Sequence, residues 1–206
     1  MEAYTTIRKH SVFEYEDRKS VFIGEALPVS TEREALDFIA SIKKSYPDAK
    51  HHVYAYVLRE NSIMRFSDDK EPQGTAGLPV LDAIRKNNCT DTVIVVTRYF
   101  GGTLLGTGGL VKAYTAAAVG ALNSAEFIRY DIYMSFKLTV SYSDYQKIIP
   151  VLTEFDLKSD DIRFTADVEV YGKIKKTEFN LFTKKTTEIT AAKAKFDEIC
   201  EKFDFS

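Results

Sequence analysis

Two segments of this 206-residue chain combine charged side chains with glycines in a pattern that suits the binding of an anion. The first, RYFGGTLLGTGG (residues 98–109), begins with Arg98 and is followed by Lys112. It contains five of the ten glycines, namely Gly101, Gly102, Gly106, Gly108 and Gly109. Glycine lets a ligand approach the backbone, and free N–H groups at a helix start attract phosphate. The spacing matches neither GxGxxG nor GxxxxGK(S/T), so two interpretations stay open: a phosphate-binding loop, or a tight strand-to-helix connection.

The second segment, SDDKEPQGTAG (residues 67–77), is polar and rich in turn-forming residues. Asp68, Asp69 and Glu71 could hold a divalent cation or act as acid and base. Three acids in an exposed turn could equally be solvated carboxylates without such a role. Gly74 and Thr75 belong to a second flexible stretch of backbone, which could lie beside the first segment.

Histidine and aromatic side chains supply the remaining candidates. His51 and His52 are adjacent at the start of a predicted strand, where successive side chains point to opposite faces and cannot chelate one metal together. His51 could still form a hydrogen bond to a ligand. Tyr99 and Phe100 end another strand, and aromatic rings beside basic residues can stack nucleobases. Tyrosines on a half-buried strand, such as Tyr54, can equally belong to the core.

The first half of the chain must position these residues, and its hydrophobic pattern alternates between strands and helices. Thr31 and Glu34 have the spacing of a capping box, and Leu36, Ile39 and Ile42 are expected on one helix face. The strands are predicted at 11–15, 20–28, 52–58, 63–66 and 91–97, and the helices at 31–46, 78–88 and 110–125. The strand at 91–97 is apolar on both faces, which predicts a central, buried strand.

After Arg129 the pattern changes to strand, helix, two strands, helix and strand. We expect these elements at 131–141, 142–155, 161–164, 167–171, 175–190 and 192–196. This is the βαββαβ order of the ferredoxin-like fold. The sequence therefore predicts two domains, residues 1–134 and residues 135–206.

Charge and composition limit the possible functions. The formal net charge is −2, with 28 basic and 30 acidic side chains spread evenly, so nucleic-acid binding would need a local basic patch. Cys89 and Cys200 are far apart without metal-ligand spacing and are expected to be buried or idle thiols. Neither a signal peptide nor an apolar run of roughly 18–20 residues is found, which predicts a soluble cytoplasmic protein without membrane contact.

Three stretches in combination closely resemble one known family. HHVYAYVL, RFSDDKEPQGTAGLPVLDAI and VIVVTRYFGGTLLGTGGLVKAYTAAA are similar to the YigZ/IMPACT family, also called uncharacterised protein family 0029. The resemblance covers roughly residues 15–128, and residues 135–206 are similar to the C-terminal module of its bacterial members. Lys70 and Gln73 stand where a glycine and a serine are expected.

The resemblance implies a mixed α/β (α+β) fold. The N-terminal domain would be a two-layer domain like domain IV of elongation factor G and a small-subunit ribosomal protein. The C-terminal domain would be ferredoxin-like, as in domain V of that factor. Eukaryotic relatives bind the activator of the amino-acid-starvation kinase through an RWD domain, which we do not expect here, so that role is not carried over.

The expected function is that of a non-catalytic, translation-associated regulatory protein that contacts RNA, the ribosome or a translation-linked partner. Two alternatives remain: a small-molecule enzyme with a phosphate site at the glycine-rich loop, kinase-like by analogy of fold, and a peptide-binding scaffold. No catalytic residue, metal ligand or cofactor is assigned. The two glycine-bearing segments are expected to line one groove. Its candidate binding residues are His51, Tyr54, Arg65, Asp68, Asp69, Glu71, Gly74, Thr75, Arg98, Tyr99, Phe100, Gly101, Gly102, Gly106, Gly108, Gly109 and Lys112.

Overall fold

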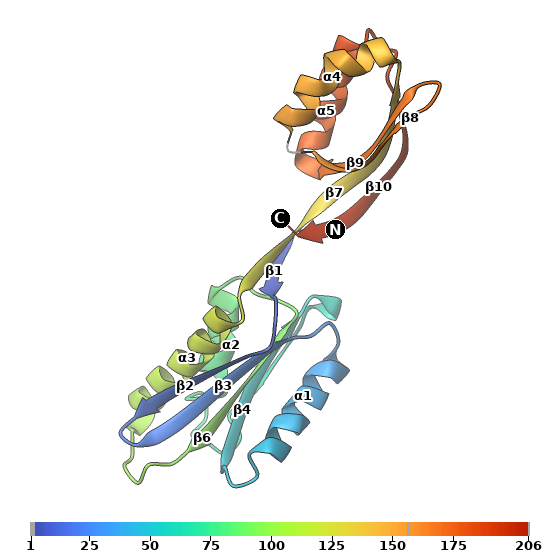
Figure 1. The fold of residues 1–206 in the computed structure, drawn as a ribbon. Coiled ribbons are helices and arrows are strands. Elements are labelled where there is room, and N and C mark those ends of the chain that lie inside the picture. Colours follow the sequence, from blue (N-terminus) through green and yellow to red (C-terminus); the bar gives the residue numbers. More distant parts are fainter. Residues whose placement is uncertain (1–2, 156, 206) are drawn as a thin grey trace. The chain divides into compact units, whose positions relative to one another are not determined.

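The structure, a computed structural model, describes residues 3–155 and 157–205. These residues form two compact units, the first of residues 4–129 and the second of residues 130–205 with residue 3, which are described separately (Figure 1). The first unit contains the strands β1 (Tyr4–Ile7), β2 (Ser11–Asp17), β3 (Ser20–Pro28), β4 (His51–Leu58), β5 (Ile63–Ser67) and β6 (Thr92–Tyr99). Its helices are α1 (Glu32–Ser45), the short 3-10 turn Glu60–Ser62, α2 (Gly77–Lys86) and α3 (Gly106–Ser124).

Five antiparallel strands form the sheet of the first unit, in the order β2-β3-β6-β4-β5. β2 and β3 are joined by a two-residue turn in which Arg18 and Lys19 have φ of 48° and 63°. Positive φ at both positions matches the twist of the flanking strands. β6 lies at the centre of the sheet, as its two-sided apolar pattern predicts.

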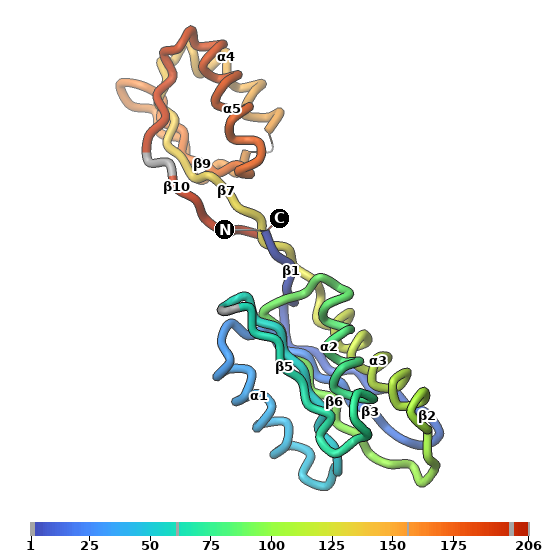
Figure 2. The backbone as a smooth tube through the Cα atoms, turned by 180° about the vertical axis from the view of Figure 1, so that it is seen from behind, coloured from blue at the N-terminus to red at the C-terminus, as the bar shows by residue number. Residues whose placement is uncertain are grey.

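Helices cover both faces of this sheet. Ile94 and Val96 of β6 pack into one core cluster with α2 and α3, whereas Val93 and Val95 pack into another with α1. Figures 1 and 2 show α1 on one side of the sheet and α2 with α3 on the other. The mixed α/β class is confirmed, and α1 adds a further layer to the expected two because β6 is apolar on both faces.

The capping box predicted for α1 is present. Thr31 Oγ1 accepts the N–H of Glu34 at 3.2 Å, and Glu34 Oε2 accepts the N–H of Thr31 at 3.2 Å. The expected apolar face is wrong at Leu36, which is 49% exposed, because the buried face follows Ala35, Ile39 and Ile42 at spacings of four and three residues.

Replacing Thr31 with alanine is expected to lower the free energy of unfolding by about 1 kcal/mol, because the backbone N–H of Glu34 at the helix start loses its side-chain acceptor. Chemical denaturation measures the change. Ser41→Ala is the matched control, since the Ser41 hydroxyl donates to the Phe38 carbonyl oxygen on the exposed side of the same helix. Equal stability of the two variants would contradict a capping role for Thr31.

Small side chains let α3 approach the sheet closely. The face of α3 toward the sheet carries Ala113, Ala117 and Ala121, all fully buried. Opposite them on β3 is Gly24, where an added Cβ would lie 2.5 Å from the carbonyl oxygen of Ala117. The alanine-rich sequence of α3 therefore sets its distance from the sheet.

The second unit has the βαββαβ order that the sequence predicts. Its elements are β7 (Phe127–Val140), which belongs to this unit from Tyr130 on, α4 (Tyr142–Glu154), β8 (Lys158–Phe164), β9 (Val168–Lys175), α5 (Lys176–Ile189) and β10 (Lys195–Phe205). The antiparallel strands lie in the order β10-β7-β9-β8. Phe136, Ile148 and Phe182 belong to a core between this sheet and the two helices. β10 is longer than expected because it pairs with β7 from Thr139 to Tyr130.

The two cysteines are both free thiols in different surroundings. Cys89 is buried, and burial raises the pKa of its thiol, whereas Cys200 is exposed. Among the described helices, none is long and apolar enough to cross a membrane.

Candidate functional site

Glu71, Arg98 and Tyr114 form a buried cluster in the first unit, which we call the buried triad. Glu71 Oε1 accepts a hydrogen bond from Arg98 Nη1 at 2.6 Å and another from the Tyr114 hydroxyl at 2.7 Å. The Arg98 and Glu71 side chains are 7% and 4% exposed, and Tyr114 is fully buried. Burial and the nearby Glu71 carboxylate raise the pKa of Tyr114 well above its usual value, so its hydroxyl remains a donor.

The guanidinium of Arg98 retains donor capacity beyond this ion pair. Its central carbon lies 5.3 Å from the ring centroid of Phe22 and 5.6 Å from that of Phe100. Arg98 Nε is buried, and no group in the described part of the chain accepts its hydrogen. A buried donor without an acceptor costs about 1–3 kcal/mol, so an oxygen supplied by a ligand would be stabilised here.

A pocket of about 480 Å³ contains Glu71 and Arg98 in its lining, and we call it the basic pocket. Lys50 and Lys70 add two further positive charges to the lining. The first residues of α3, Gly106 and Thr107, also line it. Among the described side chains, none caps the start of α3, so its first N–H groups can serve a ligand.

Apolar side chains form the other part of the basic pocket. They are Phe100, Leu104, Leu105 and Leu110, together with Pro72. Phe100 is 53% exposed and Leu104 is 82% exposed. The pocket therefore offers donors and positive charge beside an apolar surface, and this combination suits an anion that carries an apolar or planar group.

His51 lines the same pocket in a defined tautomer. Its Nδ1 lies 2.9 Å from the carbonyl oxygen of Asp69, which can only accept a hydrogen bond. Nδ1 therefore carries the proton, and Nε2 is the acceptor in the neutral ring.

Asp68 and Asp69 have structural partners, in contrast to both sequence-based interpretations. Asp68 accepts the N–H groups of Gly74, Ala76 and Gly77 at 2.9, 3.1 and 2.8 Å, which caps the start of α2. Asp69 Oδ2 accepts the N–H of His52 at 2.6 Å. Within the described residues, no group of three or more histidine, cysteine or acidic side chains is placed to hold a metal ion.

Residues of both glycine-bearing segments thus line one pocket, but only part of the candidate set lies there. The candidates in the lining are His51, Glu71, Arg98, Phe100 and Gly106.

Two candidates on the β4–β5 hairpin lie elsewhere. The Tyr54 ring stacks on that of Tyr56 at 6.3 Å and packs against the cluster beneath α1. Arg65 is exposed on β5, where its Nη1 donates to the carbonyl oxygen of Met64.

The candidates of the glycine loop divide between backbone roles and the helix start. Gly101 donates its N–H to Ser20 Oγ at 3.0 Å, and an added Cβ would lie 2.1 Å from the carbonyl carbon of Lys19. The tight-connection interpretation therefore holds at Gly101. Gly102 has φ of +87°. Tyr99 ends β6, Gly108 and Gly109 lie in the first turn of α3, and Lys112 is exposed on that helix.

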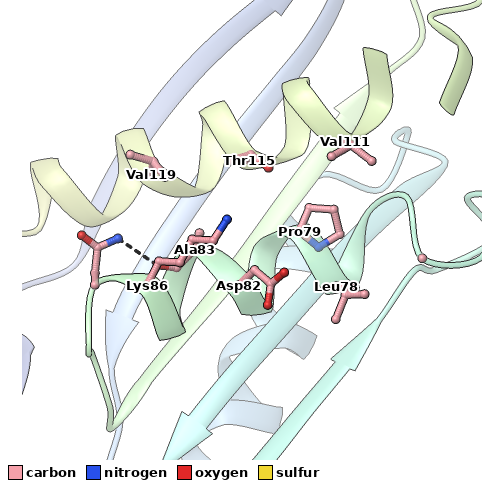
Figure 3. A pocket seen from close by; sticks show the side chains of 10 residues that line it. Leu78, Pro79, Asp82, Ala83, Lys86, Val111, Thr115 and Val119 are labelled. Carbon is pink, nitrogen blue, oxygen red and sulfur yellow. Dashed lines mark hydrogen bonds between the residues drawn. The ribbon is translucent and has the colours of Figure 1, made fainter. Parts of the chain in front are cut away.

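The remaining candidates lie near the start of α2. Thr75 is buried and its hydroxyl donates to the Pro72 carbonyl oxygen at 2.7 Å. Gly74 lies at a second, smaller groove of about 260 Å³ between α2 and α3. Figure 3 shows this groove, with Leu78 and Pro79 of α2 opposite Val111 of α3. Neither Gly74 nor Gly102 is among the described residues that line the basic pocket.

Three important residues were not predicted from the sequence. Tyr114 lies in the motif KAYTAAA, but only the fold shows that its hydroxyl reaches Glu71. Lys50 directly precedes His51, the first residue of β4 and itself a candidate. This position next to a candidate residue could have identified Lys50 as a binding residue. Lys70 has φ of +71°, the left-handed region that favours glycine, which is the residue expected there from the resemblance.

Comparisons with known proteins cover both units. The model of the Impact N-terminal domain matches residues 18–122, which include every residue of the basic pocket, and a domain of unknown function (DUF1949) matches residues 138–193. The chain is 36% identical to the IMPACT family member YvyE of Bacillus subtilis, over 96% of this chain and 92% of YvyE. It is 36% identical to the IMPACT family member YigZ of Escherichia coli, over 69% of this chain and 72% of YigZ.

A solved structure described as the crystal structure of a hypothetical protein has the same fold. Its sequence is 30% identical to this chain, and the TM-score is 0.61. The superposition covers 95% of this chain and 97% of that one. The similarity therefore extends over both units.

Proposed function

The chain belongs to the IMPACT family, and on this premise we propose that it is a non-catalytic, cytoplasmic binding protein associated with translation. In this proposal the basic pocket holds a phosphate group of single-stranded RNA, free or within the ribosome. The observation that carries the proposal is the partly unsatisfied guanidinium of Arg98, which Glu71 and Tyr114 hold in a pocket with two lysines.

Preorganised donors favour a phosphate as the bound group. Glu71 holds Arg98 Nη1 through a hydrogen bond, and Tyr114 in turn holds Glu71. Arg98 therefore loses little side-chain freedom when it binds an anion. The start of α3 adds backbone N–H groups and a positive partial charge to Lys50 and Lys70. Such a local patch meets the requirement set by a nearly neutral chain.

Exposed apolar side chains beside the charges favour RNA as the carrier of the phosphate. Phe100 is more than half exposed at the end of β6, within cation–π distance of Arg98. A single-stranded nucleic acid presents bases that stack on such a ring while its phosphates contact basic groups.

The engagement of the acidic side chains supports binding rather than phosphoryl transfer. A kinase-like site needs carboxylates that hold Mg²⁺ or accept a proton. Asp68 is bonded to three backbone N–H groups, Asp69 to one, and Glu71 to Arg98 and Tyr114. These bonds take up the acids that the enzyme alternative would use.

Replacing Lys50 with alanine and Lys70 with glycine is expected to weaken RNA binding about tenfold, because each lost contact with phosphate contributes up to about 1 kcal/mol. The slope of log K against log salt for single strands is about 0.7 for each phosphate that is neutralised, so the loss of this phosphate contact should lower the slope by about 0.7. Fluorescence anisotropy with a labelled single-stranded RNA at several salt concentrations measures both quantities.

The two substitutions are expected to preserve the fold. Lys70→Gly relieves a left-handed backbone strain of about 1–2 kcal/mol, which offsets the entropy that glycine adds to the unfolded chain. The control variant is Lys43→Ala with Lys44→Ala, which removes the same charge from the exposed end of α1. Equal RNA affinity of the two double variants, or capture of a protein but no RNA through the basic pocket, would refute the proposal.

A further inference from the structure

The size of the basic pocket suits a compact ligand. Its volume of about 480 Å³ lies within the roughly 300–1,000 Å³ typical of small-molecule sites. Proteins that follow an RNA backbone instead use an extended basic groove. Here the cationic groups of Lys50, Lys70 and Arg98 line one pocket, which favours a single strongly charged phosphate over a row of phosphodiesters.

The charges of the lining match those of a phosphate monoester. Lys50, Lys70 and Arg98 contribute three positive charges and Glu71 one negative charge, so the described lining carries +2 with His51 neutral. A phosphate monoester carries about −1.5 to −2 at pH 7, whereas an internal phosphodiester carries −1. The excess charge is therefore best balanced by a terminal phosphate.

Arg98 provides an observation independent of the helix start. Its side chain lines the pocket and is only 7% exposed. Its Nε has no acceptor among the described groups. Glu71 accepts its hydrogen bonds from Nη1 and from the Tyr114 hydroxyl, and it forms none with Nε. A ligand oxygen would complete the hydrogen bonding of the guanidinium.

The apolar part of the pocket limits what the phosphate is attached to. Phe100, Leu104 and Leu105 give a surface for a planar or apolar group next to the cationic groups. Inorganic phosphate would leave this surface uncovered. A nucleoside 5′-phosphate carries its phosphate on the exocyclic C5′, so the charged group can enter the pocket while the sugar and the base cover this surface.

We infer that the basic pocket binds a nucleoside 5′-monophosphate group, as the 5′-phosphorylated end of an RNA or as a free nucleotide. The inference rests on the proposed function and goes beyond it by naming a chain end rather than an internal phosphate. Lys50, Lys70, Arg98 and the first N–H groups of α3 hold the phosphate, and Phe100 packs against the base.

The test compares short single-stranded RNAs of one sequence that carry a 5′-phosphate, a 3′-phosphate or no terminal phosphate. The 5′- and 3′-phosphorylated forms have the same charge, so they separate recognition of the end from simple attraction. With the full chain, anisotropy should show at least tenfold tighter binding of the 5′-phosphorylated RNA than of either other form, which is about 1.4 kcal/mol. AMP should displace it, and inorganic phosphate should do so far less effectively.

The Lys50→Ala, Lys70→Gly variant should lose the preference for the 5′-phosphate, while the Lys43→Ala, Lys44→Ala control keeps it. Equal affinity for the 5′- and 3′-phosphorylated RNAs overturns the inference and leaves the proposed RNA binding intact. Binding of AMP without binding of any RNA supports the pocket's ligand class and refutes the proposed function. Absence of binding in every arm overturns both.

Discussion

Replacing Glu71 with alanine is expected to lower the free energy of unfolding by about 3–5 kcal/mol, because the substitution leaves Arg98 buried without its counter-charge. The two side chains are 4% and 7% exposed and lie 2.6 Å apart. The Tyr114 hydroxyl also loses its acceptor, which adds the cost of a second buried polar group. Denaturant unfolding followed by circular dichroism measures the loss.

Asp82→Ala is the matched control for this prediction. Asp82 forms an ion pair with Arg85 at 3.5 Å, with side chains 41% and 57% exposed. An exposed pair of this kind contributes about 0–1 kcal/mol because water and salt screen it. A loss at Glu71 no larger than that at Asp82 would show that the triad is not buried.

A triple variant separates the stability of the triad from its charge. Glu71→Met, Arg98→Met and Tyr114→Phe remove all of its polar groups at once, and hydrophobic replacement of a buried ion pair is often neutral or stabilising. We expect it to regain most of the stability that Glu71→Ala loses and yet to bind RNA weakly, since Arg98 is absent. Tight RNA binding by a folded triple variant would show that Arg98 does not contribute to the RNA-binding site.

The triad also predicts how stability changes in alkaline solution. Burial, with the Glu71 carboxylate, raises the pKa of Tyr114 above its usual value of 10.0. The contribution of the protonated hydroxyl is therefore fully present below pH 10 and is lost as the pH rises above that value.

Replacing Gly101 with alanine is expected to cost about 1–3 kcal/mol or more, the range for adding atoms to a packed interior. The new Cβ would lie 2.1 and 2.2 Å from the carbonyl carbon and oxygen of Lys19, and 2.4 Å from the nitrogen of Ser20. These are backbone atoms of the β2–β3 turn, so they cannot move away from the new Cβ as the end of a flexible side chain would. Thermal and chemical unfolding both measure the cost.

Gly108→Ala provides the control from the same glycine-rich segment. Apart from its chain neighbours and the nearby backbone of α3 itself, no described atom lies within 4 Å of the Cβ position at Gly108, which belongs to the first turn of that helix. Alanine in a helix is favoured over glycine by roughly 0.5–1 kcal/mol, so this variant should be unchanged or slightly more stable. Similar losses at Gly101 and Gly108 would contradict the close contact with the turn.

Local patterns were sufficient to predict much of the fold. The Thr31–Glu34 capping box lies within one turn, and the period of β6 depends only on its own residues. The ferredoxin-like order of the second unit follows from the succession of strand and helix periods. The length of β10 could not be predicted in this way, because its extent depends on pairing with β7.

The candidate site was harder to predict because its key contacts join distant residues. Asp68, Asp69 and Glu71 look alike in the sequence, yet only Glu71 is buried. That difference arises from Arg98, 27 residues away, and Tyr114, 43 residues away. The glycines likewise look equivalent, although Gly101 meets the β2–β3 turn and Gly106 begins α3.

The close contact of α3 with Gly24 has a consequence for the kinetics of binding. An alanine-faced helix packed directly on β3 has little room to shift, so the start of α3 is in place before a ligand arrives. When the competent conformation already dominates, no slow isomerisation precedes binding and the measured affinity is not reduced by a minor population. Association should then follow a single exponential, with a rate constant that rises as the ionic strength falls.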